Sequence, residues 1–368
     1  MRIAFYAPMK PPTHPVPSGD RRMARALMAA LSVAGHEVTL ASEFRAYEGA
    51  GDGVRQAEIR AAGTVEAARL IMGPRFDAWF TYHLYHKAPD WLGPAVSRAL
   101  AVPYVVAEAS HAAKQAAGPW AAGHAAAAGA IATADMVLAM TANDREGLAG
   151  LVGDPARLRA LPPFLDARPL AAARAERDHH RAVLAARHGL DSARPWALTV
   201  AMMRPGAKLA SYRLLGAALA GLPEGAAEVI AIGDGPARAD VLAAMPALSH
   251  PLGEVSEEAL AAWYGAADLL VWPAVDEAYG MALLEAQAAG LPVVAGAAPG
   301  VAEMVADGGV IVPPGDVAAF TAAVAGLLGE PERRRRLGAA AARRVAAHHD
   351  LAAGARALSA ALAAVRRR

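Results

Sequence analysis

Residues 268–286 read DLLVWPAVDEAYGMALLEA, and this stretch decides the fold. It begins with a short apolar run, 268–272, that is typical of a buried strand, and it continues into an apolar run that predicts a helix from Gly280. Between the two lies a loop that contains Glu277. The rest of the chain also alternates short apolar runs with longer alanine-rich runs, which is the pattern of parallel strands covered by helices. We therefore expect an α/β fold.

The predicted strands share short apolar or β-branched runs, and the predicted helices share longer alanine-rich runs. In the first half we expect strands at residues 3–7, 37–41, 77–82, 104–107, 136–139 and 158–161, with a helix at 20–33 after the first strand. In the second half we expect strands at 196–201, 228–232, 268–272, 292–295 and 310–312. Helices are expected there at 212–220, 237–244, 257–266, 280–289, 318–328 and 330–347.

The chain is long enough for two domains, because its 368 residues exceed the size at which one hydrophobic core stops growing. Residues 162–182 contain three prolines and a charged stretch but no clear strand pattern, so we place the interdomain linker there. The two domains are then expected at 1–168 and 169–349. Doubly wound sheets bind ligands outside the carboxyl ends of their strands, so two such domains facing each other would make a cleft.

The composition excludes several classes of protein. With 55% hydrophobic and 19% charged residues the chain is too apolar for a disordered protein, and no window reaches the ~20 apolar residues that span a bilayer. The first residues lack the long apolar core of a secretory signal, and the chain has no cysteine. We therefore predict a soluble protein of the cytoplasm.

The charge distribution argues against nucleic-acid binding. The net charge is +1, and the basic runs 333–336 and 366–368 lack interleaved aromatic residues that could stack on bases. We interpret both runs as solvated helix ends. The alternative is peripheral contact with anionic lipid at the inner membrane face, because a few basic residues on a helix add affinity for a negative leaflet.

Two carboxylates stand in the stretch quoted above. Glu277 lies in the loop, whereas Glu285 lies among Leu283, Leu284 and Ala286 in the predicted helix. An unpaired charge is costly to bury there, so Glu285 is expected to meet hydrogen-bond donors, and ribose hydroxyls would serve. The alternative is that Glu285 is a surface glutamate and that Glu277 only complements the positive end of the helix.

Residues 252–338 resemble the donor domain of family 4 glycosyltransferases. The similarity includes 252–255 (LGEV), 267–269 (ADL), the Glu-x7-Glu segment at 277–285, 289–294 (AGLPVV) and 314–316 (PGD). A looser similarity extends over the first half, through 35–38, 134–138 and 161–166. The resemblance implies the GT-B fold, two Rossmann-like doubly wound domains that face each other across a cleft. It also implies that a helix at 350–368 completes the first, acceptor-side domain and that 169–349 bind the nucleotide-sugar donor.

The resemblance implies roles for residues of the donor site. Glu277 is expected near the donor sugar and the β-phosphate, and Glu285 at the nucleotide ribose. Arg204 and Lys208 would hold the leaving diphosphate, although Arg204 is one position closer to Lys208 than is usual in the family. Further donor-binding positions are the backbone amides of Tyr279, Gly280 and Met281, the glycine Gly233 and, in the first loop of the chain, Gly19.

The first domain is expected to bind the acceptor, a carbohydrate or a lipid-linked molecule. The chain has four lysines, and each falls in a loop after a predicted strand, where a compact positive charge suits phosphate or a polar substrate. Many family members place a histidine after the fourth strand, but here Ala109 holds that position. His83, His86, Glu108 and His111 are therefore rival candidates for the polar group near the reacting sugar, with His83 and His111 as catalytic candidates beside Glu277. The acceptor-side candidates are Lys10, Lys87, Glu108 and Lys114.

We expect neither a metal nor a cofactor. The sequence has no Asp-x-Asp motif, which commonly holds a divalent ion on a nucleotide-sugar diphosphate, and the histidine pairs at 179–180 and 348–349 lack metal-ligand spacing. Arg204, Lys208 and helix amides would then neutralise the leaving group.

The resemblance implies retaining transfer of a sugar to an acceptor hydroxyl, in the synthesis of a glycan, a glycolipid or a polysaccharide. Three alternatives stay open. A glycoside hydrolase also needs two carboxylates but acts without a nucleotide. A GT-B epimerase acts on a nucleotide sugar without an acceptor, and a nucleotide-sugar-binding partner subunit would have no activity of its own. The motifs leave the base, the sugar, the acceptor and the oligomeric state open.

Overall fold

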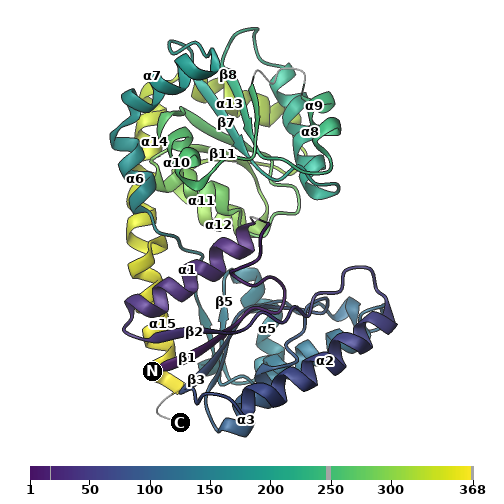
Figure 1. Cartoon of the computed structure of the whole chain (residues 1–368). Helices are drawn as coiled ribbons and strands as arrows, with labels where there is room; N and C mark the ends of the chain where they lie inside the picture. The colour runs from purple at the N-terminus through teal and green to yellow at the C-terminus, as the bar shows by residue number, and fades with distance from the viewer. Residues whose placement is uncertain (17, 246–249, 366–368) are drawn as a thin grey trace. The chain divides into compact units, whose positions relative to one another are not determined.

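The computed structural model describes residues 1–16, 18–245 and 250–365 (Figure 1). It divides into two compact units. The first contains Met1–Phe164 together with the chain from Leu351 onward, and the second contains Leu165–Asp350. The expected boundaries after residues 168 and 349 lie close to these divisions. The chain thus leaves the first unit, forms the second and returns to the first.

The described residues of the first unit form a six-stranded parallel sheet in the order β2-β1-β3-β4-β5-β6. Its strands are nearly continuous apolar runs, as in β5, because helices cover both faces of a parallel sheet. The bounds are β1 (Arg2–Tyr6), β2 (Glu37–Ser42), β3 (Ala78–Leu84), β4 (Tyr104–Ala109), β5 (Met136–Ala139) and β6 (Leu158–Ala160).

Helices cover the two faces of the first sheet. On one side α1 packs against α15, so the C-terminal helix belongs to this unit (Figure 1). On the other side Tyr6, Trp79 and Tyr104 share a buried core with residues of α2, α3, α4 and α5. The bounds are α1 (Gly19–Val33), α2 (Gly53–Ile71), α3 (Gly93–Leu100), η1 (Ala113–Gln115), α4 (Ala121–Thr133), α5 (Ala142–Val152), η2 (Pro155–Arg157) and α15 (Leu351–Val365).

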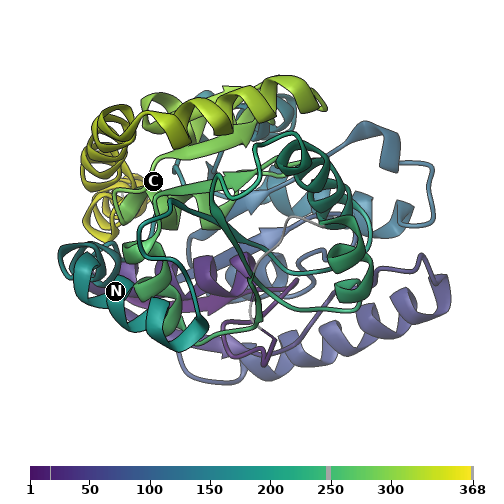
Figure 2. The same ribbon diagram turned by 90° about the horizontal axis from the view of Figure 1, so that it is seen from above.

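The described residues of the second unit also form a six-stranded parallel sheet, in the order β12-β11-β10-β7-β8-β9. Helices lie on both of its sides: α8 packs with α9 and α13, and α10 and α11 pack with α6 (Figures 1 and 2). The strands are β7 (Trp196–Val200), β8 (Glu228–Ile232), β9 (His250–Gly253), β10 (Leu269–Trp272), β11 (Val293–Gly296) and β12 (Gly309–Val312). The helices are α6 (Arg168–Ala175), α7 (Arg177–His188), α8 (Ala207–Ala220), α9 (Arg238–Ala244), α10 (Glu257–Ala266), α11 (Met281–Ala288), α12 (Pro299–Val305), η3 (Ala306–Gly308), α13 (Val317–Gly329), α14 (Pro331–Arg344) and the π turn η4 (Val345–His349).

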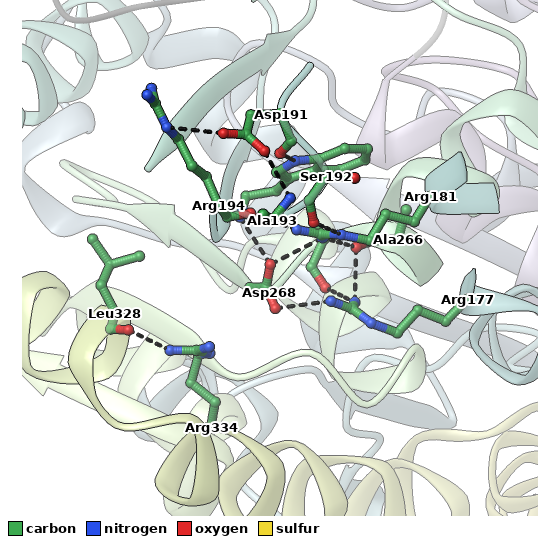
Figure 3. Close-up of polar contacts among 12 residues, drawn as sticks. Arg177, Arg181, Asp191, Ser192, Ala193, Arg194, Ala266, Asp268, Leu328 and Arg334 are labelled. Atoms are coloured by element: carbon green, nitrogen blue, oxygen red, sulfur yellow. Dashed lines mark hydrogen bonds and ion pairs between the residues drawn. The ribbon is translucent and has the colours of Figure 1, made fainter. Parts of the chain in front are cut away.

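The segment that the sequence analysis interpreted as a linker is mostly helical. Helices α6 and α7 begin within residues 162–182 and pack on α10. Arg177 and Arg181 of α7 reach the carboxyl end of α10 (Figure 3). Both donate to the carbonyl of Ala266, at 2.7 and 2.9 Å, and both pair with Asp268, at 2.8 and 3.0 Å. They satisfy carbonyl groups that a helix end leaves without intrahelical partners.

The basic run at 333–336 lies in α14, and part of it is used inside the unit. Arg333 pairs with Glu330, and Arg335 pairs with Glu332. Arg334 donates to the carbonyl of Leu328 at 2.6 Å (Figure 3). The other basic run, 366–368, lies outside the described residues. Among the described helices, none is long and apolar enough to cross a membrane.

Each sheet has one point at which the strand order reverses. In the first unit this switch point lies between β1 and β3, and in the second it lies between β7 and β10. Helices that follow the two strands leave toward opposite faces there, so the loops separate and leave a crevice at the carboxyl ends. The loops after β1 and β3, and those after β7 and β10, are therefore the places to seek ligand-binding side chains.

Candidate functional site

An ion pair bridges the switch point of the second unit. Lys208 stands in the first turn of α8, after β7, and its ammonium group contacts the carboxylate of Glu277, in the loop after β10. The indole of Trp272 adds a hydrogen bond to Glu277 at 3.3 Å, and the Lys208 Nζ lies 5.3 Å from the centre of that ring. The two charged side chains are 23% and 18% exposed, so both remain reachable. Two predicted site residues are thus brought together.

The loop between β10 and α11 has an unusual backbone. Ala274 and Asp276 have φ angles of 56° and 48°, in the left-handed region that residues with a Cβ rarely adopt. Ser211 of α8 anchors the loop, since its hydroxyl accepts a hydrogen bond from the Val275 amide at 3.0 Å. Such strained positions cost about 1–3 kcal/mol each, and they concentrate at binding sites.

Gly280 starts the helix that follows this loop. Its φ is 72°, and a Cβ there would lie 2.8 Å from Cδ1 of Leu283, so any other residue would be strained at this position. The Gly280 carbonyl accepts the amide of Leu283 at 2.9 Å, which closes the first turn of α11. The amides at Tyr279–Met281 therefore stand at the amino end of a helix, where anions are favoured.

Glu285 lies on the next turns of α11, and it is only 6% exposed. The hydroxyl of Tyr264, a buried residue of α10, donates to its Oε2 at 2.9 Å. The predicted need for a hydrogen-bond donor is therefore met by at least one protein group.

Arg204 and Gly233 occupy neighbouring strand ends. The Arg204 side chain is exposed in the loop between β7 and α8. Gly233 follows β8, and a Cβ there would lie 1.9 Å from the carbonyl oxygen of Ala201, so only glycine allows the two loops to approach. Lys208, Glu277, Arg204 and Gly233 thus lie in loops or first turns that follow the carboxyl ends of three adjacent strands, β10, β7 and β8.

A second cluster occupies the switch point of the first unit. His83 lies near the end of β3, and its Nδ1 is 3.2 Å from Asp20 Oδ1 and 3.6 Å from Glu108 Oε1. Asp20 is in the first turn of α1, and Glu108 is near the end of β4. His83 and Glu108 also have left-handed backbone conformations, with φ angles of 60° and 55°. Three neighbouring strands or their loops thus bring one imidazole between two carboxylates.

The carboxylates set the charge of His83. Burial lowers the pKa of His83, but Glu108 and Asp20 outweigh burial and raise it to about 9. Burial conversely raises the pKa of Asp20, but its contact with His83 outweighs this and lowers the pKa. His83 is therefore an imidazolium at neutral pH, and Asp20 beside it is ionised.

The other sequence candidates of the first unit lie in different surroundings. His111 stacks near His124, with ring centres 4.4 Å apart, and burial together with His124 lowers its pKa. Lys87 lies over the ring of Trp120, and Lys114 is exposed in η1. Gly19 is the first residue of α1, and Lys10 is close enough to Asp20 to lower its pKa.

Asp20 is the member of the His83 cluster that the sequence analysis missed. One signal could have revealed it, because Asp20 opens the first predicted helix directly after the first strand, at the carboxyl edge of the sheet. Among the described residues, no group of three or more histidine, aspartate or glutamate side chains is arranged to hold a metal ion.

Solved structures with a similar fold superpose on nearly the whole chain. A glycosyltransferase from Rickettsia africae superposes with a TM-score of 0.76 at 14% identity, covering 100% of this chain and 99% of that one. HepE from Anabaena in complex with UDP superposes with a TM-score of 0.75 at 15% identity, covering 99% and 100%. Sucrose-phosphate synthase from Thermosynechococcus elongatus gives 0.73 at 20% identity and 98% of both chains. The fold is GT-B. The expected fold class of two Rossmann-like doubly wound domains is confirmed.

Within this GT-B chain, residues 194–330 match the family Glycosyl transferases group 1. D-inositol 3-phosphate glycosyltransferase from Xylanimonas cellulosilytica is 31% identical over 241 residues, 62% of this chain and 54% of that protein. D-inositol 3-phosphate glycosyltransferase 2 from Catenulispora acidiphila is 47% identical over 81 residues, 22% of this chain and 19% of that protein. The chain thus spans about half the length of the first relative and about a fifth of the second. Over residues 194–330 the predicted resemblance is confirmed at the coarser level of Glycosyl transferases group 1, and Glu277 and Glu285 both lie in this part.

Proposed function

We propose that the protein is a retaining glycosyltransferase that moves a sugar from a nucleotide-sugar donor to an acceptor hydroxyl. One observation carries the proposal: the Lys208–Glu277 pair bridges the β7/β10 switch point, inside the part that matches group 1 glycosyltransferases. A cation and a carboxylate held together there can bind one ligand that carries both a phosphate and a sugar. Lysine suits a phosphate, and a carboxylate suits sugar hydroxyls.

The donor site would then be built around α11. The diphosphate would contact Lys208, the exposed Arg204 and the amides at Tyr279–Met281, and the ribose would contact Glu285. HepE from Anabaena, which shares the fold, has been solved with UDP and with UDP-glucose, so UDP-sugars are the first donors to test. Because Gly233 lets the loops after β7 and β8 approach closely, it would shape the wall of the same pocket.

The proposed reaction breaks the bond between the anomeric carbon and the diphosphate oxygen. Negative charge grows on the leaving diphosphate while the sugar becomes oxocarbenium-like, so preorganised cations and amides lower the barrier. Lys208 and the amino end of α11 supply them, and Glu277 orients the sugar. The acceptor oxygen then bonds to the anomeric carbon on the face that the diphosphate leaves, and the hydroxyl proton passes to the departing diphosphate. No metal is required in this scheme, because protein groups neutralise the leaving group.

We assign the acceptor, a carbohydrate or a lipid-linked molecule, to the first unit. The cluster of Asp20, His83 and Glu108 favours His83 over His111 as the polar group near the reacting sugar. The carboxyl oxygens of Asp20 and Glu108 can accept hydrogen bonds from acceptor hydroxyls, and the imidazolium can donate one. His83 thus lies where an acceptor hydroxyl can be oriented.

Calorimetric titration with UDP, GDP and ADP, with and without magnesium, tests the donor site. We expect one nucleotide to bind equally with and without magnesium. Glu285→Gln should weaken binding, because it alters the ribose contact while it keeps the size of a buried side chain. Glu258→Gln, an exposed position on α10, is the matched control. If none of the nucleotides binds to the folded protein, the glycosyltransferase proposal fails and, of the three alternatives, the glycoside hydrolase remains.

A GT-B epimerase is the second candidate, and the same ion pair would serve it. It is distinguished by its products. Incubation of a bound nucleotide sugar without any acceptor would give an epimerised sugar from an epimerase, whereas a transferase would need the acceptor.

Peripheral membrane contact is the remaining part of the proposal. Because Arg333, Arg334 and Arg335 have partners inside the second unit, the α14 run has little free charge for lipid. We expect weak, salt-sensitive flotation with vesicles that contain anionic lipid. Flotation that persists in high salt would show a contact of another kind.

A further inference from the structure

A pocket of about 240 Å³ lies in the first unit, apart from the His83 cluster. Three segments line it: the loop after β2 with the start of α2, the loop after β3, and the start of α4. Two of these loops follow the carboxyl ends of β2 and β3, which is the edge of the sheet that also presents His83. The residues that matter below are Glu48, Arg60, His86, Lys87, Trp91 and Trp120.

Glu48 fixes one wall of this pocket. Its carboxylate accepts hydrogen bonds from the amides of Ala50 and Gly51, at 2.6 and 2.8 Å. It also accepts from Gln56 Nε2 at 3.2 Å and from the indole of Trp120 at 3.0 Å. Four donors thus satisfy the one carboxylate in the pocket, and the Trp120 ring is held in place.

Two cations face the pocket over aromatic rings. Lys87 Nζ lies 4.2 Å from the ring centre of Trp120, and the Arg60 guanidinium lies 5.6 Å from that of Trp91. In the described part of the chain, neither cation forms an ion pair with a carboxylate, which sets them apart from Lys208 and from Arg55 and Arg69 of α2. Burial, together with Lys87 and His124, lowers the pKa of His86, so His86 adds no charge at neutral pH.

We propose that this pocket binds a sugar ring that carries an anionic group, with the anion on Lys87 and Arg60 and the ring beside the indoles. This inference rests on the proposed function and specifies it, because such a ring would be the acceptor or part of it. The volume lies below the ~300–1,000 Å³ of pockets for drug-sized ligands, so it suits one monosaccharide-sized group. Phosphate and carboxylate share the chemistry that the two cations recognise.

Binding is tested on the full-length protein without donor, by calorimetry and by tryptophan fluorescence. The probes are glucose 6-phosphate, glucuronate, glucose and inorganic phosphate. We expect one of the two anionic sugars to bind and to change the fluorescence, with glucose and inorganic phosphate each at least tenfold weaker. Whichever of the two anionic sugars binds shows whether the pocket recognises a phosphate or a carboxylate.

Variants assign the binding to the pocket. Lys87→Gln and Arg60→Gln should each weaken the anionic sugar roughly tenfold, because each removes a charge-assisted contact. Arg55→Gln, on the same helix as Arg60 but outside the pocket, should leave binding unchanged. Trp120→Phe should reduce the fluorescence response.

The proposal is overturned if glucose binds as tightly as both anionic sugars, or if both charge variants leave the binding of the anionic sugar intact. A folded protein that binds neither anionic sugar would also overturn it. Titration of the same protein with UDP separates the two hypotheses. UDP binding without sugar binding would reject the pocket and keep the transferase, whereas sugar binding without any nucleotide binding would reject the transferase.

Discussion

At the scale of single side chains, two cationic residues with carboxylate partners define the chemistry. His83 is a cation between two carboxylates, and Lys208 is a cation beside one carboxylate. Each lies at the switch point of its own sheet. In both cases the protein supplies a cation together with carboxylate groups, so an incoming ligand can exchange partners with them.

The charge of His83 makes stability depend on pH. The pKa of His83 is about 9 in the folded protein and about 6.5 in an unfolded chain. The charge of His83 therefore contributes fully to the free energy of unfolding below pH 6.5, and this contribution is lost as pH rises through 9. We expect the free energy of unfolding to fall by up to about 3 kcal/mol over that window. Urea unfolding at several pH values measures this. In His83→Gln the same decrease should be absent, and an unchanged slope would contradict the assignment.

Lys208 should contribute to nucleotide binding through its charge. Lys208→Gln is expected to weaken the binding of a nucleoside diphosphate by about 1.5–3 kcal/mol, as for a hydrogen bond to a charged group. Calorimetric titration gives the value. Arg213→Gln, an exposed arginine on the same helix, serves as the control and should bind normally. Equal affinity of both variants would remove Lys208 from the site.

At the scale of elements, α7 is held by polar contacts more than by an apolar stripe. Leu184 is its one buried residue in the described structure, whereas Arg177 and Arg181 reach Asp268 and the end of α10. Asp268 also accepts the Trp196 amide at 2.8 Å, so it joins α7 to the start of β7.

Asp268→Asn should therefore loosen α7. The substitution leaves two half-buried arginines with one neutral partner, and we expect a loss of about 2–4 kcal/mol in the free energy of unfolding. Urea unfolding measures the loss, and hydrogen exchange should show it first in α7. Asp178→Asn, at an exposed position of α7, should change stability by less than about 0.5 kcal/mol. Similar losses in both variants would show that α7 is simply intolerant of substitution.

The contrast between elements held by apolar burial and elements held by polar contacts also explains which of them the sequence predicts. Buried central strands such as β5 are continuous apolar runs, so the predicted and observed bounds coincide at Met136–Ala139. β9 was missed because it is a short, half-exposed edge strand with a proline, and α7 was missed because arginine contacts replace the apolar stripe. At the candidate sites, sequence motifs indicated Glu277 and Lys208. Asp20 was not indicated because its partner, His83, comes from a strand more than 60 residues away.

At the scale of the whole molecule, ligand binding should act on one unit. A nucleotide present at 100 times its Kd stabilises the state that binds it by about 2.7 kcal/mol. We expect this increase in hydrogen-exchange protection for β7–β12, with little change in β1–β6. The matched experiment on Lys208→Gln, at the same nucleotide concentration, should show less protection. Equal protection of both sheets in the wild type would indicate that the two units unfold together.

The division of the chain also has a consequence for its synthesis. The second unit is complete once Asp350 has been added, but α1 of the first unit lacks its neighbour α15 until the last helix has been made. The contact between α1 and α15 therefore joins parts of the chain more than 300 residues apart, and the first unit receives this helix only after all of the second unit has been made. Because contacts between distant parts of a chain form slowly, we expect the docking of α15 to be a late step in folding.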